Sequence, residues 1–138
     1  MRLIDLIRLQ AERLQEATAL LEKLQPDIPE GTPEAEQYAQ NLADGRASLA
    51  ARKQFIAQLE GAQTALNNYT THQSNATLES LVRSYKTLFV SQENPIARQY
   101  LAPQSDPTPR LGCGSCRRKL VAKLRQALEK QYSDDLFG

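Results

Sequence analysis

The chain has 138 residues, a formal net charge of +1 and 6% aromatic residues, with no Trp. No stretch approaches the roughly 20 apolar residues that a membrane-spanning helix needs, so we expect no membrane partner. Charged residues interrupt the N-terminal segment, which therefore lacks the apolar run of a secretory signal. We expect a location inside a cell or in a virion.

Composition and charge distribution favour helices and a dipolar molecule. Leu, Ile and Ala must supply most of the core, and these residues together with Gln, Glu, Arg and Lys predict an all-α fold. Residues 1–70 hold seven cations and ten carboxylates, whereas residues 71–138 hold ten cations and six carboxylates. Such a chain can bind an anionic partner or stack head to tail with its own copies.

A long antiparallel helical hairpin is predicted for the N-terminal half. Residues 2–25 carry apolar side chains at steps of three and four, which is typical of one helix face. Turn formers follow at 26–31, and Thr32-Pro33 begins a second helix that runs to about residue 70. The apolar stripe of the first helix is wider than one neighbour covers, so we expect partner chains here. The residues predicted to contact partners are Leu3, Ile7, Leu14, Leu21, Leu42, Leu49 and Ile56.

Shorter helices are predicted in the second half. The polar segment 67–75 indicates a break, followed by helices at 76–91 and 95–101. The Pro-rich segment 103–109 is typical of a stiff, extended linker, and a last helix is predicted at 115–132. We divide the chain into a helical hairpin and bundle (1–102), a Pro/Gly linker with a Cys turn (103–114), and a C-terminal basic helix with an acidic-aromatic tail (115–138).

Both cysteines, Cys113 and Cys116, are separated by two residues at the predicted start of the last helix. A helix start beside cations favours thiolates, as in a thioredoxin-type redox pair, but no βαβ context is predicted. A structural zinc ion needs four ligands, so the pair can bind zinc only with a second copy, with His72 and a carboxylate, or with another protein. The interpretation we favour is that both thiols fill a gap beneath a turn made by Gly112 and Gly114, with no cofactor.

The last predicted helix carries cations around its apolar side. These cations can contact phosphates or an acidic protein face, or they can form the solvated side of an amphipathic helix. The candidate phosphate-binding residues are Arg117, Arg118, Lys119, Lys123 and Arg125.

The chain ends in an acidic-aromatic tail. Asp135-Leu136-Phe137 is similar to the end of bacterial sliding-clamp binding peptides, although the expected spacing from the upstream Gln is not kept. We predict that Leu136 and Phe137 dock on a neighbouring molecule.

The sequence contains no Ser-His-Asp set, glycine-rich phosphate loop or His-Glu-x-x-His pattern, so we do not expect an enzyme. The segment from Cys113 to Lys119 resembles Cys-Gly-x-Cys-basic segments near the ends of some small tailed-phage proteins. The resemblance covers seven residues and implies a role for none of them.

We therefore predict a non-enzymatic assembly or adaptor protein that oligomerises through helix packing. A phage virion component, such as a head-tail connector, neck or portal-associated protein, is the interpretation we favour, with its own copies and other assembly proteins as partners. The alternative is a nucleic-acid-binding or replication accessory protein that uses the basic helix and the acidic tail.

Overall fold

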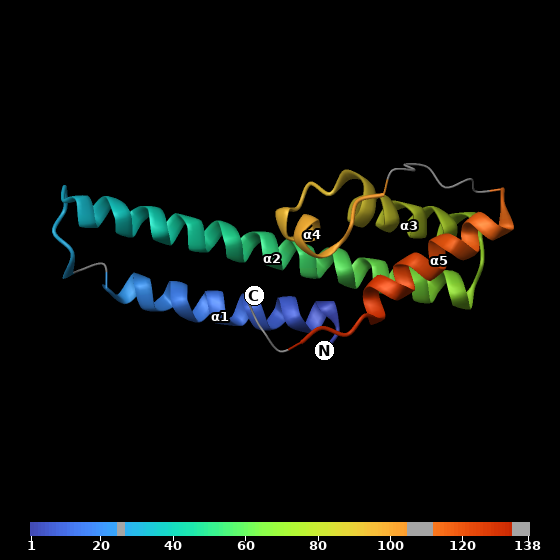
Figure 1. Cartoon of the computed structure of the whole chain (residues 1–138), viewed down its shortest axis with the longest axis horizontal. Helices are drawn as coiled ribbons and strands as arrows, with labels where there is room; N and C mark the ends of the chain where they lie inside the picture. The colour runs from blue at the N-terminus through green and yellow to red at the C-terminus, as the bar shows by residue number, and fades with distance from the viewer. Residues whose placement is uncertain (25–26, 105–111, 134–138) are drawn as a thin grey trace.

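The fold is a long two-helix hairpin with shorter helices gathered at one end (Figure 1). The computed structural model describes residues 1–24, 27–104 and 112–133. Within these residues the prediction of an all-α fold is confirmed, and no β-strand is present. The elements are α1 (Leu3–Leu24), α2 (Pro33–Thr71), α3 (Asn75–Tyr85), the π-helical segment η2 (Lys86–Ser91), α4 (Pro95–Tyr100) and α5 (Gly114–Glu129).

The predicted hairpin is confirmed, and α1 and α2 pack against each other in opposite directions (Figure 1). Gly31 turns the chain with a φ of 77°, a left-handed conformation that glycine adopts without steric cost. The hydroxyl of Thr32 then accepts a hydrogen bond from the Ala35 N–H at 3.2 Å, and Pro33 occupies the first turn. These two signals set the start of α2 where the sequence predicts it.

Three features of the predicted helices differ from the structure. The predicted helix at 76–91 is α-helical only to Tyr85 and continues as η2. The helix α2 ends at Thr71, close to the predicted end at about residue 70, but the break predicted at 67–75 is confined to residues 72–74, because Tyr69 is buried in the core and holds the last turn of α2 in place. The helix α5 ends at Glu129, three residues early, because the next residues pair with the N-terminus instead. Met1 and Tyr132 exchange two backbone hydrogen bonds, each 2.7 Å long.

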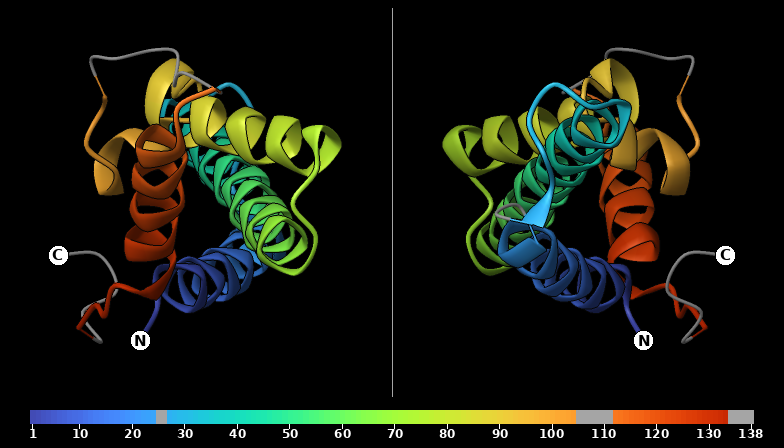
Figure 2. Two further views of the ribbon diagram at one scale, coloured as in Figure 1. Left: turned by 90° about the vertical axis from the view of Figure 1, so that its right-hand side faces the viewer. Right: turned by 90° about the vertical axis from the view of Figure 1, so that its left-hand side faces the viewer.

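A single core fills the space between the C-terminal half of α2 and the elements around it (Figure 2). Asn94 caps α4, and its amide also donates to the backbone carbonyl of Ala51 on α2 at 2.8 Å, which fixes α4 against the hairpin. Residues that anchor the core from different elements are Leu3, Phe55, Leu59, Leu81, Leu88 and Leu124.

The C-terminal helix α5 packs on its own chain. It contacts α1, α2 and α3, and Leu120, Leu124 and Leu128 are buried there. The wide apolar stripe of α1 is therefore covered near its start by the chain's own helices. Residues 105–111 of the predicted linker lie outside the described residues.

The other end of the hairpin extends beyond the bundle (Figure 1). We call this part the distal arm and define it as residues 14–24, 27–32 and 33–48. No residue of the distal arm belongs to the core cluster of the described chain. The two arm helices instead touch each other, with Thr18 and Leu42 buried between them. Among the described residues, no helix has the length and apolarity needed to cross a membrane.

Candidate functional site

The distal arm lies at one end of the long axis and α5 begins near the other end (Figure 1), and the two carry opposite charge. One surface is the distal arm, whose described residues hold seven carboxylates and two cations. The other is the exposed side of α5, and residues 112–130 hold six cations and one carboxylate. The sequence predicts this dipolar distribution, and the fold turns it into a separation in space.

The distal arm is held by a few specific contacts. Glycine at position 45 allows the helices to approach closely, since a Cβ atom there would lie 3.3 Å from the Thr18 hydroxyl. Nearer the tip, Arg46 pairs with Glu22 at 2.9 Å, and the Tyr38 hydroxyl donates to a backbone carbonyl of α1. These contacts use one side of each helix and leave the other sides exposed.

Leu20 and Leu24 form an apolar edge on the distal arm. Their side chains are 61% and 54% exposed, and they are the large hydrophobic residues most accessible in the described chain. Because they are four residues apart in α1, they lie on the same helix face, one turn apart. Neither residue is among the predicted partner-binding residues, although the periodicity places Leu24 on the apolar stripe of the first helix and Leu20 beside it.

The predicted partner-binding residues divide into four groups. Leu3 and Ile7 are fully buried by their own chain, so they belong to the core and cannot contact a partner in this fold. Leu42 is buried inside the distal arm. Leu136 and Phe137 lie outside the described residues. The half-buried members are Leu14, Leu21, Leu49 and Ile56.

A cavity of about 570 Å³ lies where α5 passes the end of α2. We call it the arginine pocket. On α5, the residues Gly114, Arg118, Val121 and Arg125 recur at helical spacing and therefore share one face. Arg117 and Ala122 also line the cavity, and Tyr69, Thr70 and Gln73 form its wall on the α2 side.

The guanidinium groups of the arginine pocket differ from those of the hairpin. Arg117, Arg118 and Arg125 have no ion-pair partner among the residues that the structure describes. Part of their role is local, because they bring positive charge close to the end of α2, whose last turn has no basic residue. In contrast, carboxylates pair with Arg2, Arg8, Arg13 and Arg46.

The structure separates the five predicted phosphate-binding residues. Arg117, Arg118 and Arg125 meet in the arginine pocket. Lys123 instead donates a hydrogen bond to the side chain of Gln104, and Lys119 does not line the cavity. Tyr69, Thr70 and Gln73 complete the pocket from a distant part of the sequence, and no local pattern marks them.

The two thiols have a different role from the one predicted. Cys113 caps α5, because its sulfur accepts a hydrogen bond from the Cys116 N–H at 3.3 Å. Both side chains are half-exposed rather than enclosed beneath a turn, and neither Gly112 nor Gly114 has a positive φ. The Cys pair therefore forms a helix start at the surface.

Hydrogen bonds to the Cys113 sulfur, first from the Cys116 thiol and then from Ser115, lower the pKa of Cys113 to about 7. The same thiol–thiol bond raises the pKa of Cys116, since Cys116 is the donor. Cys113 is therefore the more nucleophilic thiol near neutral pH.

The described residues contain no group of three or more His, Cys, Asp or Glu side chains placed to hold a metal ion. The alternative in which His72 and a carboxylate complete a zinc site with the cysteines therefore has no support. A site shared between two molecules stays a prediction.

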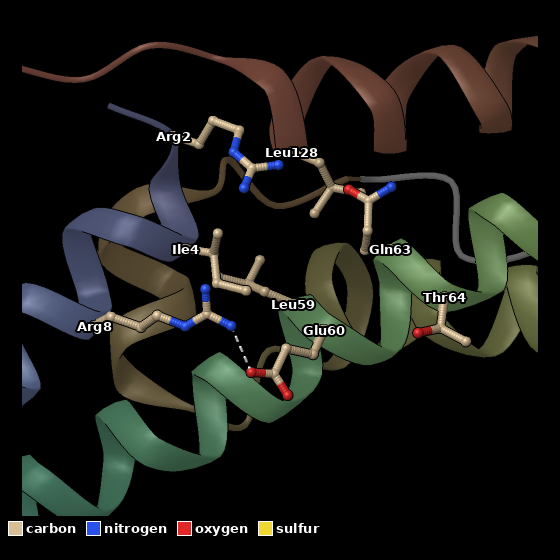
Figure 3. Close-up of a pocket in the computed structure, with 8 residues that line it drawn as sticks. All are labelled: Arg2, Ile4, Arg8, Leu59, Glu60, Gln63, Thr64 and Leu128. Carbon is tan, nitrogen blue, oxygen red and sulfur yellow. Dashed lines mark hydrogen bonds and ion pairs between the residues drawn. The ribbon is translucent and has the colours of Figure 1, made fainter.

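A second cavity, of about 360 Å³, lies between the start of α1, the middle of α2 and the end of α5 (Figure 3). Arg8 and Glu60 form an ion pair of 2.8 Å across its edge, as the dashed line shows. Ile4, Leu59 and Leu128 supply apolar walls. The Glu60 carboxylate of this cavity is thus already paired with Arg8. We interpret the cavity as a groove where three helices meet.

A comparison with protein-family models, curated proteins and solved structures finds no significant match for this chain. The two exposed surfaces are therefore the features of this chain that bear on its function.

Proposed function

We propose that this protein is a non-enzymatic assembly protein whose distal arm packs against another helical molecule. The observation that supports the proposal is the apolar edge of Leu20 and Leu24, which lies on a two-helix arm outside the core. Completing the burial of one such leucine stabilises a contact by about 1–2 kcal/mol, given ~1.5–3 kcal/mol for a fully exposed side chain. An adjacent pair of this kind on a projecting hairpin is suited to helix-on-helix docking.

The proposal has a more specific form, in which the protein is a phage virion component such as a head-tail connector or neck protein. This form depends on the resemblance of residues 113–119 to small tailed-phage proteins, and it includes the expected location in a host cell or virion. It stays a prediction.

The test is the oligomeric state of the full chain, measured by sedimentation velocity over a range of protein concentrations. We expect the wild type to form concentration-dependent oligomers and the variant Leu20→Ser/Leu24→Ser to remain monomeric. The matched control is Ala17→Ser/Ala19→Ser, which changes two exposed residues of the same helix and should assemble normally. Circular dichroism must show equal helicity for all three proteins. A wild type that stays monomeric at high micromolar concentration would contradict self-assembly.

The second candidate function is nucleic-acid binding, and the arginine pocket favours it. Guanidinium groups bind phosphates as readily as they bind carboxylates. The chain as a whole is less suitable, because its sequence pI is about 7.8, whereas nucleic-acid-binding domains commonly exceed 9. Duplex binding predicts an affinity that falls steeply with salt, with a log–log slope of about −0.9 per phosphate contact.

The two candidates respond differently to changes in the distal arm. Substituting Leu20 and Leu24 should leave duplex affinity unchanged, because both lie on α1, which supplies no residue to the arginine pocket. Substituting Arg117 and Arg125 by Ala should reduce duplex affinity and its salt slope if the pocket binds phosphates. A filter-binding titration at several salt concentrations measures both quantities.

A further inference from the structure

We infer that the partner of the distal arm is a second copy of this chain, which receives the arm tip in its arginine pocket. The inference rests on the proposed assembly function and gives it a partner and a geometry. We define the arm tip as residues 27–36, the turn and the first helical residues between α1 and α2.

The arm tip carries charge that complements the pocket. Asp27, Glu30, Glu34 and Glu36 are its four carboxylates, and it contains no cation. None of the four has an ion-pair partner among the described residues. Glu34 and Glu36 also favour the start of α2, because they lie in its first turn. Asp27 and Glu30 precede the helix, so this local role does not account for them.

The arginine pocket offers the matching groups. Its three guanidinium groups each present a planar set of donors that fits a carboxylate, and they have no such partner within the described chain. The cavity also begins at the N-terminal end of α5, where the helix dipole favours negative charge. An acidic loop is therefore a suitable occupant.

Apolar groups support the same match. Val121 and Ala122 lie on the α5 wall of the pocket, between charged neighbours. On the arm, Leu24 ends α1 at the approach to the tip and is 54% exposed. A contact with an apolar centre and a charged rim has the usual anatomy of a protein interface.

A nucleic acid is the competing occupant, and two observations favour protein over it. Tyr69 is the aromatic residue that lines the pocket, and it is only 6% exposed, so its ring offers no surface on which a base can stack. In addition, the net charge of the chain is only +1, because the distal arm carries the carboxylates that offset the pocket. The chain thus contains its own complementary surface.

The placement of the two surfaces determines the type of assembly. The arm tip and the arginine pocket lie at opposite ends of the long axis, so one copy cannot join its own tip to its own pocket (Figure 1). A contact between different patches on two copies is heterologous, and repetition produces a closed ring or an open filament.

Charge reversal with complementation tests the inference. The tip variant is Asp27→Lys/Glu30→Lys, which leaves the first turn of α2 intact. The pocket variant is Arg117→Glu/Arg118→Glu, whose carboxylates remain compatible with the start of α5. We expect each variant alone to be monomeric. An equimolar mixture should regain assemblies of wild-type size, because the two introduced lysines then meet the two introduced glutamates and the unchanged tip meets the unchanged pocket. The control for the change in charge is Lys53→Glu/Lys86→Glu, which replaces two exposed residues that lie away from both surfaces.

Each outcome of this experiment supports or overturns the inference. If both variants assemble as the wild type does while Leu20→Ser/Leu24→Ser does not, the tip–pocket contact is wrong and the proposed assembly function stands. If the variants are folded monomers and their mixture fails to assemble, the contact is also wrong. If the pocket variant loses duplex DNA binding and the tip variant keeps wild-type assembly, the pocket binds phosphates. A monomeric wild type overturns self-assembly and this inference together.

Discussion

A buried polar network joins three helices at the base of the distal arm. The Gln10 side chain of α1 is fully buried, and its amide donates to the Tyr100 hydroxyl at 2.7 Å. The Arg52 side chain of α2 donates to the Gln10 carbonyl oxygen at 2.9 Å and also bonds Ser48. Burial lowers the pKa of Arg52, with Tyr100 opposing the shift. The hydrogen bonds to Gln10 and Ser48 therefore have to compensate the guanidinium group of Arg52 for the solvation that it loses on burial.

We predict that Gln10→Leu and Arg52→Met each destabilise the protein, whereas the double variant does not. Gln10→Leu removes a hydrogen bond to a charged group, worth about 1.5–3 kcal/mol, and a neutral one, worth about 0.5–1.5 kcal/mol. The leucine recovers part of this loss, so we expect a net loss of about 2–4 kcal/mol. Arg52→Met removes the hydrogen bond that Arg52 donates to the buried Gln10 oxygen, at a cost of about 1–3 kcal/mol.

The double variant Gln10→Leu/Arg52→Met should lie within about 1 kcal/mol of the wild type, because apolar residues of similar size can replace a buried polar pair. Urea unfolding, followed by circular dichroism, measures the free energy of unfolding. For 138 residues at about 2.1 cal/mol/K each, a loss of 3 kcal/mol lowers Tm by about 10 °C. The control Arg13→Met breaks an exposed pair with Glu16 and should change stability by less than about 0.5 kcal/mol. A double variant as unstable as the sum of the single variants would refute the reasoning.

Two further predictions concern the thiols and the glycines of α2. Alkylation of Cys113 should rise as pH increases through about 7, ahead of Cys116, because the lowered pKa keeps Cys113 as thiolate above that pH. Mass spectrometry locates the label, and Ser115→Ala should move the midpoint to higher pH; equal rates at the two thiols would contradict this. Gly61→Ala should raise the free energy of unfolding by about 0.5–1 kcal/mol, since nothing lies within 4 Å of the new Cβ. Gly45→Ala should gain less, because its Cβ meets the Thr18 hydroxyl at 3.3 Å, and a larger gain at position 45 than at 61 would show that this contact does not matter.

Local signals in the sequence were sufficient to predict the helices and their order. Thr32-Pro33 and Asn94-Pro95 each provide a cap and a proline, and the structure starts α2 and α4 at these sites. The start of the break after α2 could not be predicted in this way, because the polar residues from 67 onward favour a break before the helix ends. There, burial of Tyr69 by distant elements outweighs the low helix propensity.

The origin of the neighbours of α1 could not be predicted either. A wide apolar stripe indicates more than one neighbour, but periodicity does not show whether they come from the same chain. The structure supplies them from within the chain, and this is why Leu3 and Ile7 are core residues. Periodicity places Arg118 and Arg125 on one face of α5, yet Tyr69 reaches the pocket only through a long-range contact.

The magnitudes indicate that the apolar edge and the charged surfaces must act together. Two leucines at about 1–2 kcal/mol each provide about 2–4 kcal/mol, whereas association costs about 4–15 kcal/mol in lost translation and rotation. Leu20 and Leu24 alone therefore cannot hold two molecules together. If the contacts of Arg117, Arg118 and Arg125 supply the remainder, assembly must weaken as salt screens them, because two of these charges are exposed and the third is half-buried. Assembly that withstands both high salt and the loss of the two leucines would require a surface other than the arm and the pocket.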